Sequence, residues 1–377
     1  MSLDARAGPA NANQRLTIIA GVLRIGPIQL DSPVVQAALA GYSDGPMRLI
    51  ARRLGAAYAL HEVVLDKSIV LSPKARRKLL PPIAPQDRPL GGQLMGAEPG
   101  VFAAAAELLV AAGFDVVDLN FGCPVRKVLG RCRGGFLLST PKIATEILRA
   151  VRGVVPPHIP VTVKMRRGMD DTAASEHNFF LLLDAAFSLG VAAVTVHGRT
   201  VMQHYRGPAD WSFLARVKRH VGAQTILGSG DLFTAGHIQR MLETTGVDGV
   251  SVARGCIGNP WIFRDARALL ADRPLPPPPS VAEQADILRE HLRLEVAAHG
   301  VAKGTVLFRR FGIRYAEVHP HPKDVRAAFV SAWLPAEINA VLDHWYDPQH
   351  SWPHGRRKAG PSEWTEPQAT GAAPLTA

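Results

Sequence analysis

The sequence has 377 residues, of which 47% are hydrophobic and 20% charged, as is typical of a globular protein with a buried core. Lysine and arginine outnumber aspartate and glutamate by 43 to 32, and the resulting net charge of +11 favours a polyanionic partner. No apolar run approaches the roughly 18 residues of a membrane span, and three cysteines give neither a disulfide framework nor a zinc motif, so we expect a cytoplasmic protein with no membrane segment and no metal site.

Residues 1–14 are rich in Gly, Pro, Ala and Asn, which predicts a disordered lead. The pattern from Leu16 to Leu30 predicts a short hairpin that could plug the bottom of a barrel. Short apolar, β-branched runs then recur, as expected for parallel strands buried on both faces. They start at Pro33, Ala56, Pro89, Asp115, Pro160, Ala192, Gln224 and Asp248.

Stretches with a period near 3.6 lie between these runs and predict helices, for example at 100–113, 141–153 and 235–246. Eight βα units within residues 15–272 favour a TIM (β/α)8 barrel, with a doubly wound sheet as the rival fold. The proline-rich segment 273–280 predicts a semi-rigid linker. Ser280 and Glu283 then form a capping box that opens a small all-helical C-terminal domain at 281–348, and residues 349–377 are expected to be a disordered tail.

Chemistry in a TIM barrel takes place at the C-terminal ends of the strands. Gly228, Gly230 and Gly255 follow the seventh and eighth predicted strands, together with the cation Arg254. Loops at these two places commonly bind phosphate through backbone N–H groups. A glycine at a strand end is often only a turn, but the pair of loops predicts a phosphate site.

Lys164 lies near the end of the fifth predicted strand, where an unpaired buried ammonium group is costly. It therefore needs an anionic or electron-rich partner. A flavin ring offers one at its N1–C2=O edge, and Gln93 could bond the pyrimidine edge of the same ring. The alternative is a structural ion pair with a carboxylate.

Cys123 follows the fourth predicted strand on a turn fixed by Pro124, beside Arg126 and Lys127. A buried small residue, a nucleophile and a general acid are three roles open to it. Its exposed turn argues against inert burial. Cys132 shares the loop and is its competitor.

Cations cluster after the strands, on what would be one face of the barrel. Arg-rich composition alone would explain the total charge but not this placement. We expect phosphate contacts from this rim and from the helical domain. The predicted substrate contacts are Asn120, Arg126, Lys127, Arg166, Arg199, Arg310 and Arg314.

These motifs resemble those of the tRNA-dihydrouridine synthase family. They are AALAGYSD from Ala37, QLMG with Gln93, DLNFGCPVRKVLGRCRGGFLL, VKMRRG from Val163, VHGRT from Val196, GSGD from Gly228 and ARGCIGNPWIF from Ala253. The resemblance covers roughly Ile28 to Arg264. The family usually reads Pro-Met-Ala-Gly where this chain has Ala-Leu-Ala-Gly from Ala38. It also usually reads Asn-Gly-Asp and Gly-Arg where this chain has Ser-Gly-Asp from Ser229 and Ala253-Arg254.

The resemblance implies an FMN enzyme that reduces the C5=C6 bond of particular tRNA uridines, with NADPH as electron donor. It implies that a hydride from flavin N5 reaches C6, that Cys123 protonates C5, and that Asn120 faces the base. The residues it places around FMN are Ala38, Leu39, Ala40, Gln93, Lys164, His197, Ser229, Gly230, Asp231, Ala253 and Arg254.

Two other functions fit the same residues. One is a flavin oxidoreductase for a small enone or dihydropyrimidine, which would leave the basic rim without a purpose. The other is a non-catalytic RNA-binding homologue. Nothing in the sequence requires an obligate protein partner, so a monomer is expected.

Overall fold

The computed structural model describes residues 22–347 and 349–360, so the expected disordered lead lies outside the described residues. Eight parallel strands surround the core. They are β3 (Val34–Gln36), β4 (Tyr58–Leu60), β6 (Leu90–Met95), β7 (Val116–Phe121), β8 (Val161–Arg166), β9 (Ala193–His197), β10 (Ile226–Ser229) and β11 (Gly249–Val252). Because β4 pairs with both β3 and β6, the sheet closes on itself. The predicted TIM barrel is confirmed, and the doubly wound alternative is wrong.

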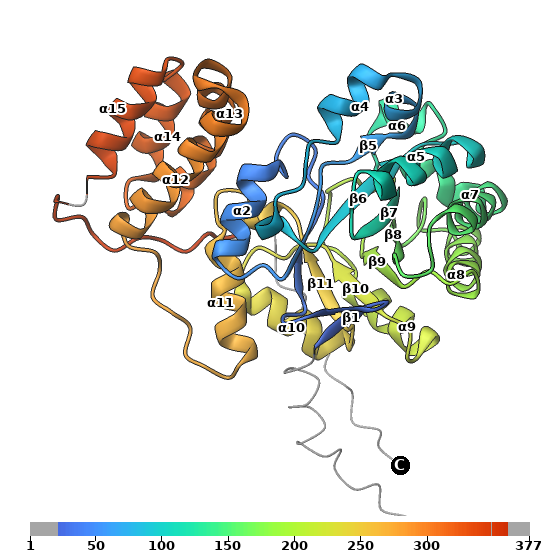
Figure 1. Ribbon diagram of the computed structural model, residues 1–377. Helices are drawn as coiled ribbons and strands as arrows, with labels where there is room; N and C mark the ends of the chain where they lie inside the picture. Colours follow the sequence, from blue (N-terminus) through green and yellow to red (C-terminus); the bar gives the residue numbers. More distant parts are fainter. Residues whose placement is uncertain (1–21, 348, 361–377) are drawn as a thin grey trace, which may run out of the picture.

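Helices cover the outside of the barrel between successive strands (Figure 1). They are α2 (Gly45–Arg53), α3 (Asp66–Leu71), α4 (Pro73–Leu79), α5 (Pro99–Ala111), α6 (Arg126–Leu129), α7 (Pro141–Val154), α8 (Ala173–Ser188), α9 (Trp211–Val221), α10 (Ala235–Thr245) and α11 (Trp261–Leu270). A short strand, β5 (Val64–Leu65), and three 3-10 turns, η1 (Pro85–Asp87), η2 (Gly134–Ser139) and η3 (Arg254–Cys256), complete it. Both faces of the strands are buried because helices cover one face and the barrel interior the other.

The predicted N-terminal hairpin is present as β1 (Leu23–Ile25) and β2 (Ile28–Leu30), which pair antiparallel. Leu23, Ile25 and Leu30 are almost fully buried against residues at the N-terminal ends of the barrel strands, including Val116 of β7. The hairpin therefore closes the bottom of the barrel, as predicted. The rest of the expected hairpin, before residue 22, lies outside the described residues.

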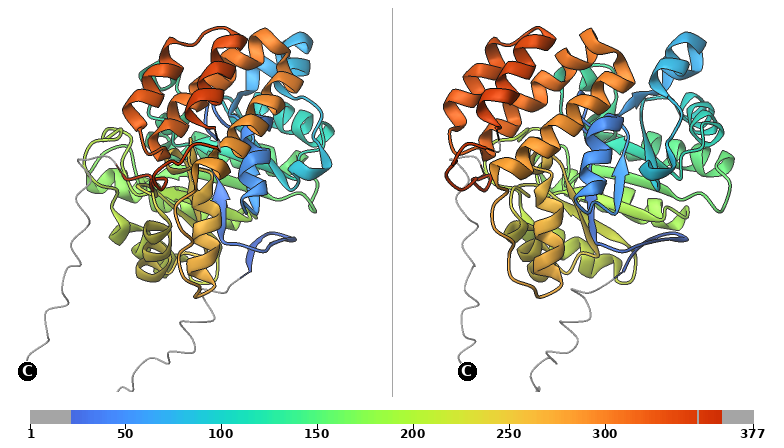
Figure 2. Two further views of the ribbon diagram at one scale, coloured as in Figure 1. Left: turned by 90° about the vertical axis from the view of Figure 1, so that its left-hand side faces the viewer. Right: turned by 60° about the vertical axis from the view of Figure 1, so that its left-hand side comes forward.

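The region after the linker is helical. It contains α12 (Val281–His299), α13 (Val301–Tyr315), η4 (Ala316–Val318), α14 (Pro322–Ser331) and α15 (Pro335–Trp345). Its helices lie together on one side of the barrel, where α12 packs against α2 (Figures 1 and 2). Residues 273–280 carry no helix or strand. No helix of the described chain is long and apolar enough to cross a bilayer.

The capping box predicted at the start of α12 is confirmed. Ser280 Oγ accepts from the backbone N–H of Glu283, and the Glu283 carboxylate accepts from the N–H of Ser280. Replacing Ser280 with alanine is expected to lower the free energy of unfolding by about 1 kcal/mol. Urea denaturation would measure this loss. Ser331→Ala, which changes an exposed residue at the end of α14, should change the value by less than about 0.5 kcal/mol.

The predicted disorder is wrong for residues 349–360. This segment returns to the barrel, where Arg357 pairs with Asp265 at 2.6 Å and Lys358 Nζ donates to the Ile257 carbonyl at 2.7 Å. The N–H of Arg356 also donates to the Val318 carbonyl. The Pro- and Gly-rich composition concealed these contacts, since they are made by isolated cations and backbone groups rather than by an apolar pattern.

Candidate active site

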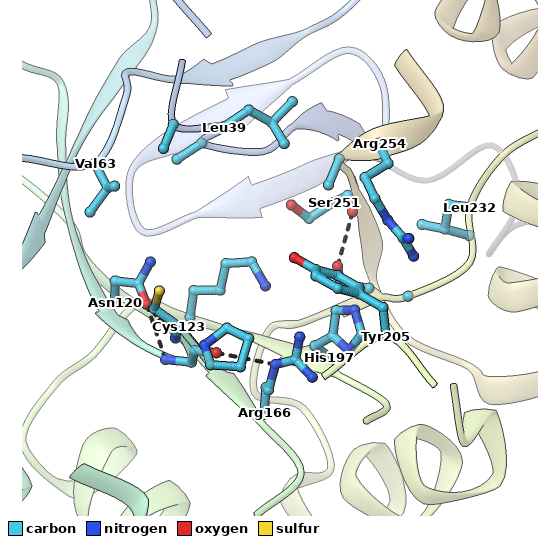
Figure 3. Close-up of a pocket in the computed structure, with 18 of the residues that line it drawn as sticks. Leu39, Val63, Asn120, Cys123, Arg166, His197, Tyr205, Leu232, Ser251 and Arg254 are labelled. Atoms are coloured by element: carbon cyan, nitrogen blue, oxygen red, sulfur yellow. Dashed lines mark hydrogen bonds between the residues drawn. The ribbon is translucent and has the colours of Figure 1, made fainter. Parts of the chain in front are cut away.

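A cavity of about 360 Å³ lies at the C-terminal ends of the barrel strands (Figure 3). Every residue that the sequence predicted around a cofactor lines it, and so do Asn120, Cys123 and Arg166. Strand closure explains this convergence, because the ends of parallel barrel strands meet at one face. Gly255, predicted as part of the phosphate site, also lines it. The remaining wall residues were not predicted from the sequence: Tyr42, Val63, Gly122, Pro124, Val125, Tyr205, Leu232, Phe233, Ser251 and Ile257.

Cys123 sits on a turn held from both sides. Asn120 Oδ1 accepts from the backbone N–H groups of Gly122 at 3.1 Å and Cys123 at 3.0 Å. On the other side, the N–H of Gly135 donates to the Cys123 carbonyl at 3.0 Å. A Cβ at Gly134 would lie only 2.8 Å from Cys123 Cβ, so glycine is needed for this approach. The thiol is half-buried in a rigid turn at the cavity wall.

The other two cysteines do not line the cavity. Cys132 is exposed. Cys256 is buried, its thiol donates to the Ala253 carbonyl at 3.1 Å, and burial raises its pKa to about 12. Cys123 is therefore the cysteine in position to react with a bound molecule.

A buried carboxylate orients the amides at the base of the site. Gln93 Nε2 donates to Asp118 Oδ2 at 2.7 Å, and Asn120 Nδ2 donates to Gln93 Oε1 at 2.8 Å. Thr162 Oγ1 donates to the other oxygen of Asp118 at 2.5 Å. Asp118 was missed in the sequence, although its spacing of two from Asn120 on a strand places both on one face. Burial raises the pKa of Asp118.

Lys164 and His197 supply two polar groups to the cavity from neighbouring strands. Among the described residues, no group forms a hydrogen bond with Lys164 Nζ, and burial lowers its pKa to about 8. His197 Nδ1 accepts from the N–H of Arg199 at 3.2 Å, which assigns the ring hydrogen to Nε2. Burial, followed by the charges of Lys164 and the arginines, holds the pKa of His197 well below its ordinary value. The ring is therefore a neutral donor.

Glycines in the loops after β10 and β11 allow close approach to neighbouring loops: Gly230 to the loop after β9, and Gly255 to the loop after β10. A Cβ at Gly230 would lie 2.7 Å from Ala209 Cβ, and one at Gly255 would lie 2.0 Å from the Leu232 carbonyl oxygen. The Arg254 guanidinium lies 4.3 Å from the centre of the Tyr205 ring. Gly228 has a different role, since its Cβ would meet Met241 Sδ at 2.5 Å. Its predicted part in the phosphate loop is wrong, because the position packs against α10.

Two predicted substrate arginines are buried and hold the backbone. Arg166 lines the cavity and donates to the carbonyls of Gly122, Thr200 and His204, and burial lowers its pKa to about 10. Arg199 does not line the cavity. Its guanidinium pairs with Asp231 at 2.7 Å and donates to the Gly207 carbonyl. The prediction of a substrate contact at Arg199 is therefore wrong, because its charge orients Asp231.

The other four predicted cations lie outside the cavity wall. Arg126 and Lys127 are exposed on α6, directly after the Cys123 turn. Arg310 pairs with Asp44 at 2.8 Å, and Arg314 pairs with Glu317 at 3.5 Å, both on the helical region. Contact with a polyanion remains a prediction for these positions.

Known proteins resemble this chain over most of its length. The family described as Dihydrouridine synthase (Dus) matches residues 35–344. A protein of Mycobacterium tuberculosis named "Probable tRNA-dihydrouridine synthase" is 36% identical over 330 residues, covering 85% of this chain and 84% of its own. The tRNA-dihydrouridine synthase B of Xanthomonas campestris is 33% identical over 326 residues, and the match covers 86% of this chain and 96% of that protein.

Solved structures share the fold at low identity. Histamine dehydrogenase from Rhizobium has a TM-score of 0.52 at 14% identity, covering 73% of this chain and 51% of that one. Morphinone reductase in complex with tetrahydroNAD has a TM-score of 0.50 at 13% identity, and the match covers 69% of this chain and 92% of that chain. These likenesses support the barrel and nothing finer.

Proposed function

This chain belongs to the dihydrouridine synthase family, and we propose that it reduces the C5=C6 bond of specific tRNA uridines with FMN as cofactor and NADPH as reductant. The observation that carries the proposal is the cavity itself. A half-buried cysteine, a lysine whose Nζ forms no hydrogen bond with any described residue and a neutral histidine donor line one cavity at the catalytic face of the barrel.

The cavity residues fit FMN. Within residues 22–347 and 349–360, Ser251 Oγ is buried without a hydrogen-bond partner and nothing forms a hydrogen bond with Lys164 Nζ, so the cavity offers polar atoms that a ligand would satisfy. Gly230, Arg254 and Gly255 line the cavity and would hold the phosphate, while Gln93, Lys164 and His197 would hold the ring. When bound, a reduced flavin supplies the hydride that C6 receives from N5, and NADPH restores the reduced flavin.

Cys123 would deliver the proton to C5. The turn held by Asn120 Oδ1 and Gly135 N–H keeps the thiol at the cavity wall, so little reorganisation is needed before proton transfer. Asn120 would therefore act through the position of Cys123 as well as by facing the base.

A uridine in folded tRNA must swing out of its stack to enter this cavity. Exposed Arg126 and Lys127 beside the Cys123 turn, with the cations of α4, would bind the surrounding phosphates. The helical region would add contacts through Arg310 and Arg314. We propose that the protein acts as a monomer in the cytoplasm.

The proposal is tested with purified protein, FMN, NADPH and unmodified tRNA. Nucleosides from the digested tRNA, analysed by mass spectrometry, should contain dihydrouridine. Full activity on free uridine with no gain from tRNA would instead support a small-molecule oxidoreductase. Tight tRNA binding by protein that takes up no FMN would support a non-catalytic RNA-binding protein.

Flavin affinity should depend on pH through Lys164. Its pKa of about 8 means that the cation is present below this pH and lost above it. If the cation binds the flavin, the dissociation constant for FMN should rise up to about tenfold for each pH unit above 8. Flavin fluorescence titrations across this range would measure the rise. Lys164→Met should bind FMN more weakly at every pH and lose the dependence; an unchanged slope in this variant would assign the titration to another group.

A further inference from the structure

A second polar cluster lies outside the cavity, where α12 packs against α2. Asp44 is the N-cap residue of α2 and comes two residues after Tyr42 of the cavity wall. His291 and Glu295 are one helical turn apart on α12 and are fully buried. One ligand-type atom from each of the three residues lies within 4.8 Å of the others. The cluster thus joins the barrel to the helical region.

His291 and Glu295 contribute buried polar atoms that have no hydrogen-bond partner in the described structure. His291 Nδ1 lies 3.0 Å from Tyr315 Oη, which leaves the Nε2 of the ring without a hydrogen-bond partner in the described structure. That nitrogen lies 3.7 Å from Glu295 Oε1. Neither oxygen of Glu295 accepts a hydrogen bond from an amide, hydroxyl or cationic group of the described residues; His299 Nε2 lies 3.6 Å from Oε2, and the Asp44 carboxyl lies within hydrogen-bond reach. When the ring hydrogen is on Nδ1 and is donated to Tyr315 Oη, Nε2 is an acceptor that faces the Glu295 carboxylate. Two buried acceptors that face each other are costly unless a cation or a proton lies between them.

The charges are also unbalanced. A third carboxylate, that of Glu62, is near enough for its charge to act on both Asp44 and Glu295. Its Oε1 is buried and has no hydrogen-bond partner among the described residues. The Asp44 carboxylate forms an ion pair with the Arg310 guanidinium at 2.8 Å. The charges of Lys303 and Arg48 also act on Glu295 and Glu62 respectively, but three carboxylates still gather at this interface, and a divalent cation would add to their compensation.

We propose that Asp44, His291 and Glu295 bind a divalent transition-metal ion, with Zn²⁺ as the best match. One imidazole and two carboxylates are a donor set that Zn²⁺ accepts. Tyr315 holds the distal nitrogen of the ring, as the outer partners of metal-binding histidines commonly do. Ligand atoms around a tetrahedral Zn²⁺ lie about 3.4 Å apart. The His291–Glu295 pair, at 3.7 Å, therefore needs little movement, and the Asp44 ligand atom already lies within 4.8 Å of the other two.

The ion would clamp the helical region to the loop that forms one wall of the cavity. Ala38, Leu39, Ala40 and Tyr42 line the cavity, and Asp44 ends the same loop. Glu295 and His291 belong to the first helix after the linker. A metal bridge would therefore set the angle between the two parts of the protein. This inference is independent of the proposed function, since none of the three ligands lines the cavity.

Elemental analysis of untagged protein, purified without chelators, tests the site. We expect about one Zn²⁺ per chain in the wild type and less than about a fifth of that in Glu295→Gln and His291→Gln. Asp286→Asn is the matched control, because it removes an exposed carboxylate from the same helix; its metal content should equal that of the wild type.

A second measurement keeps the test informative if a variant fails to fold. Wild-type protein treated with a chelator should melt several degrees lower and recover when Zn²⁺ is added back, with Mg²⁺ unable to replace it. The competing explanation is a single proton shared by the Asp44 and Glu295 carboxyls, which are close enough for a hydrogen bond. The metal site would be overturned if wild-type protein held no metal and took up none during dialysis against Zn²⁺. The shared proton would then be the explanation for the two neighbouring carboxyls.

Discussion

Replacing Cys123 with alanine is expected to lower the rate of dihydrouridine formation by about 10²–10⁴-fold. The thiol is the cysteine group that lines the cavity, and the backbone hydrogen bonds that hold it involve its N–H and C=O rather than its side chain. The turn should therefore survive the substitution. Flavin absorbance and tRNA affinity should stay at wild-type values, so that the loss is confined to the chemical step. Single-turnover assays with tRNA and pre-reduced protein measure this step directly.

Cys132→Ala is the matched control. Cys132 is exposed and lies outside the cavity wall, so turnover should change by less than about twofold. The opposite pattern, with normal turnover in Cys123→Ala and loss in Cys132→Ala, would move the proton donor to Cys132. Such a result would require the loop to rearrange when tRNA binds.

The barrel could be predicted because each strand carries its own signal. Residues such as Val117 and Leu119 are buried against helices, while Asp118 and Asn120 on the alternate positions face the interior. An apolar run that ends in polar residues marks both the strand and its catalytic end. The fold then brings these ends together, so the predicted cofactor residues meet in one cavity without any contact being known beforehand.

The errors concern residues whose role depends on a distant partner. Arg199 looked like a substrate cation, but Asp231 is 32 positions away in the chain and cannot be recognised as its partner from the sequence. Tyr205 lies in an irregular loop that has no periodic pattern. Asp44 and Glu295 are separated by most of the chain, so nothing in the sequence pattern indicates that the two carboxylates meet. Long-range pairings of polar groups are visible only once the chain is folded.

Asp231→Asn is expected to lower the free energy of unfolding by about 3–5 kcal/mol. Asp231 and Arg199 have side chains only 2% and 3% exposed, and their ion pair spans 2.7 Å. Asp231 Oδ2 also accepts from the N–H of Ala209 at 2.7 Å. The amide preserves size and tolerates the left-handed backbone at this position, where φ is 57°. The loss therefore reports the uncompensated charge of Arg199.

Urea denaturation of flavin-free protein would measure this loss. Asp343→Asn breaks the exposed pair with Arg289, whose side chains are 45% and 68% exposed, and should cost less than about 1 kcal/mol. Adding Arg199→Met to Asp231→Asn should recover part of the stability, because the buried cation is removed together with its partner. Stability of Asp231→Asn equal to that of Asp343→Asn would show that water reaches Arg199. In that case the ion pair would not be what holds the loop after β10, and the neighbouring glycines at 228 and 230 would have to fix its position by packing alone.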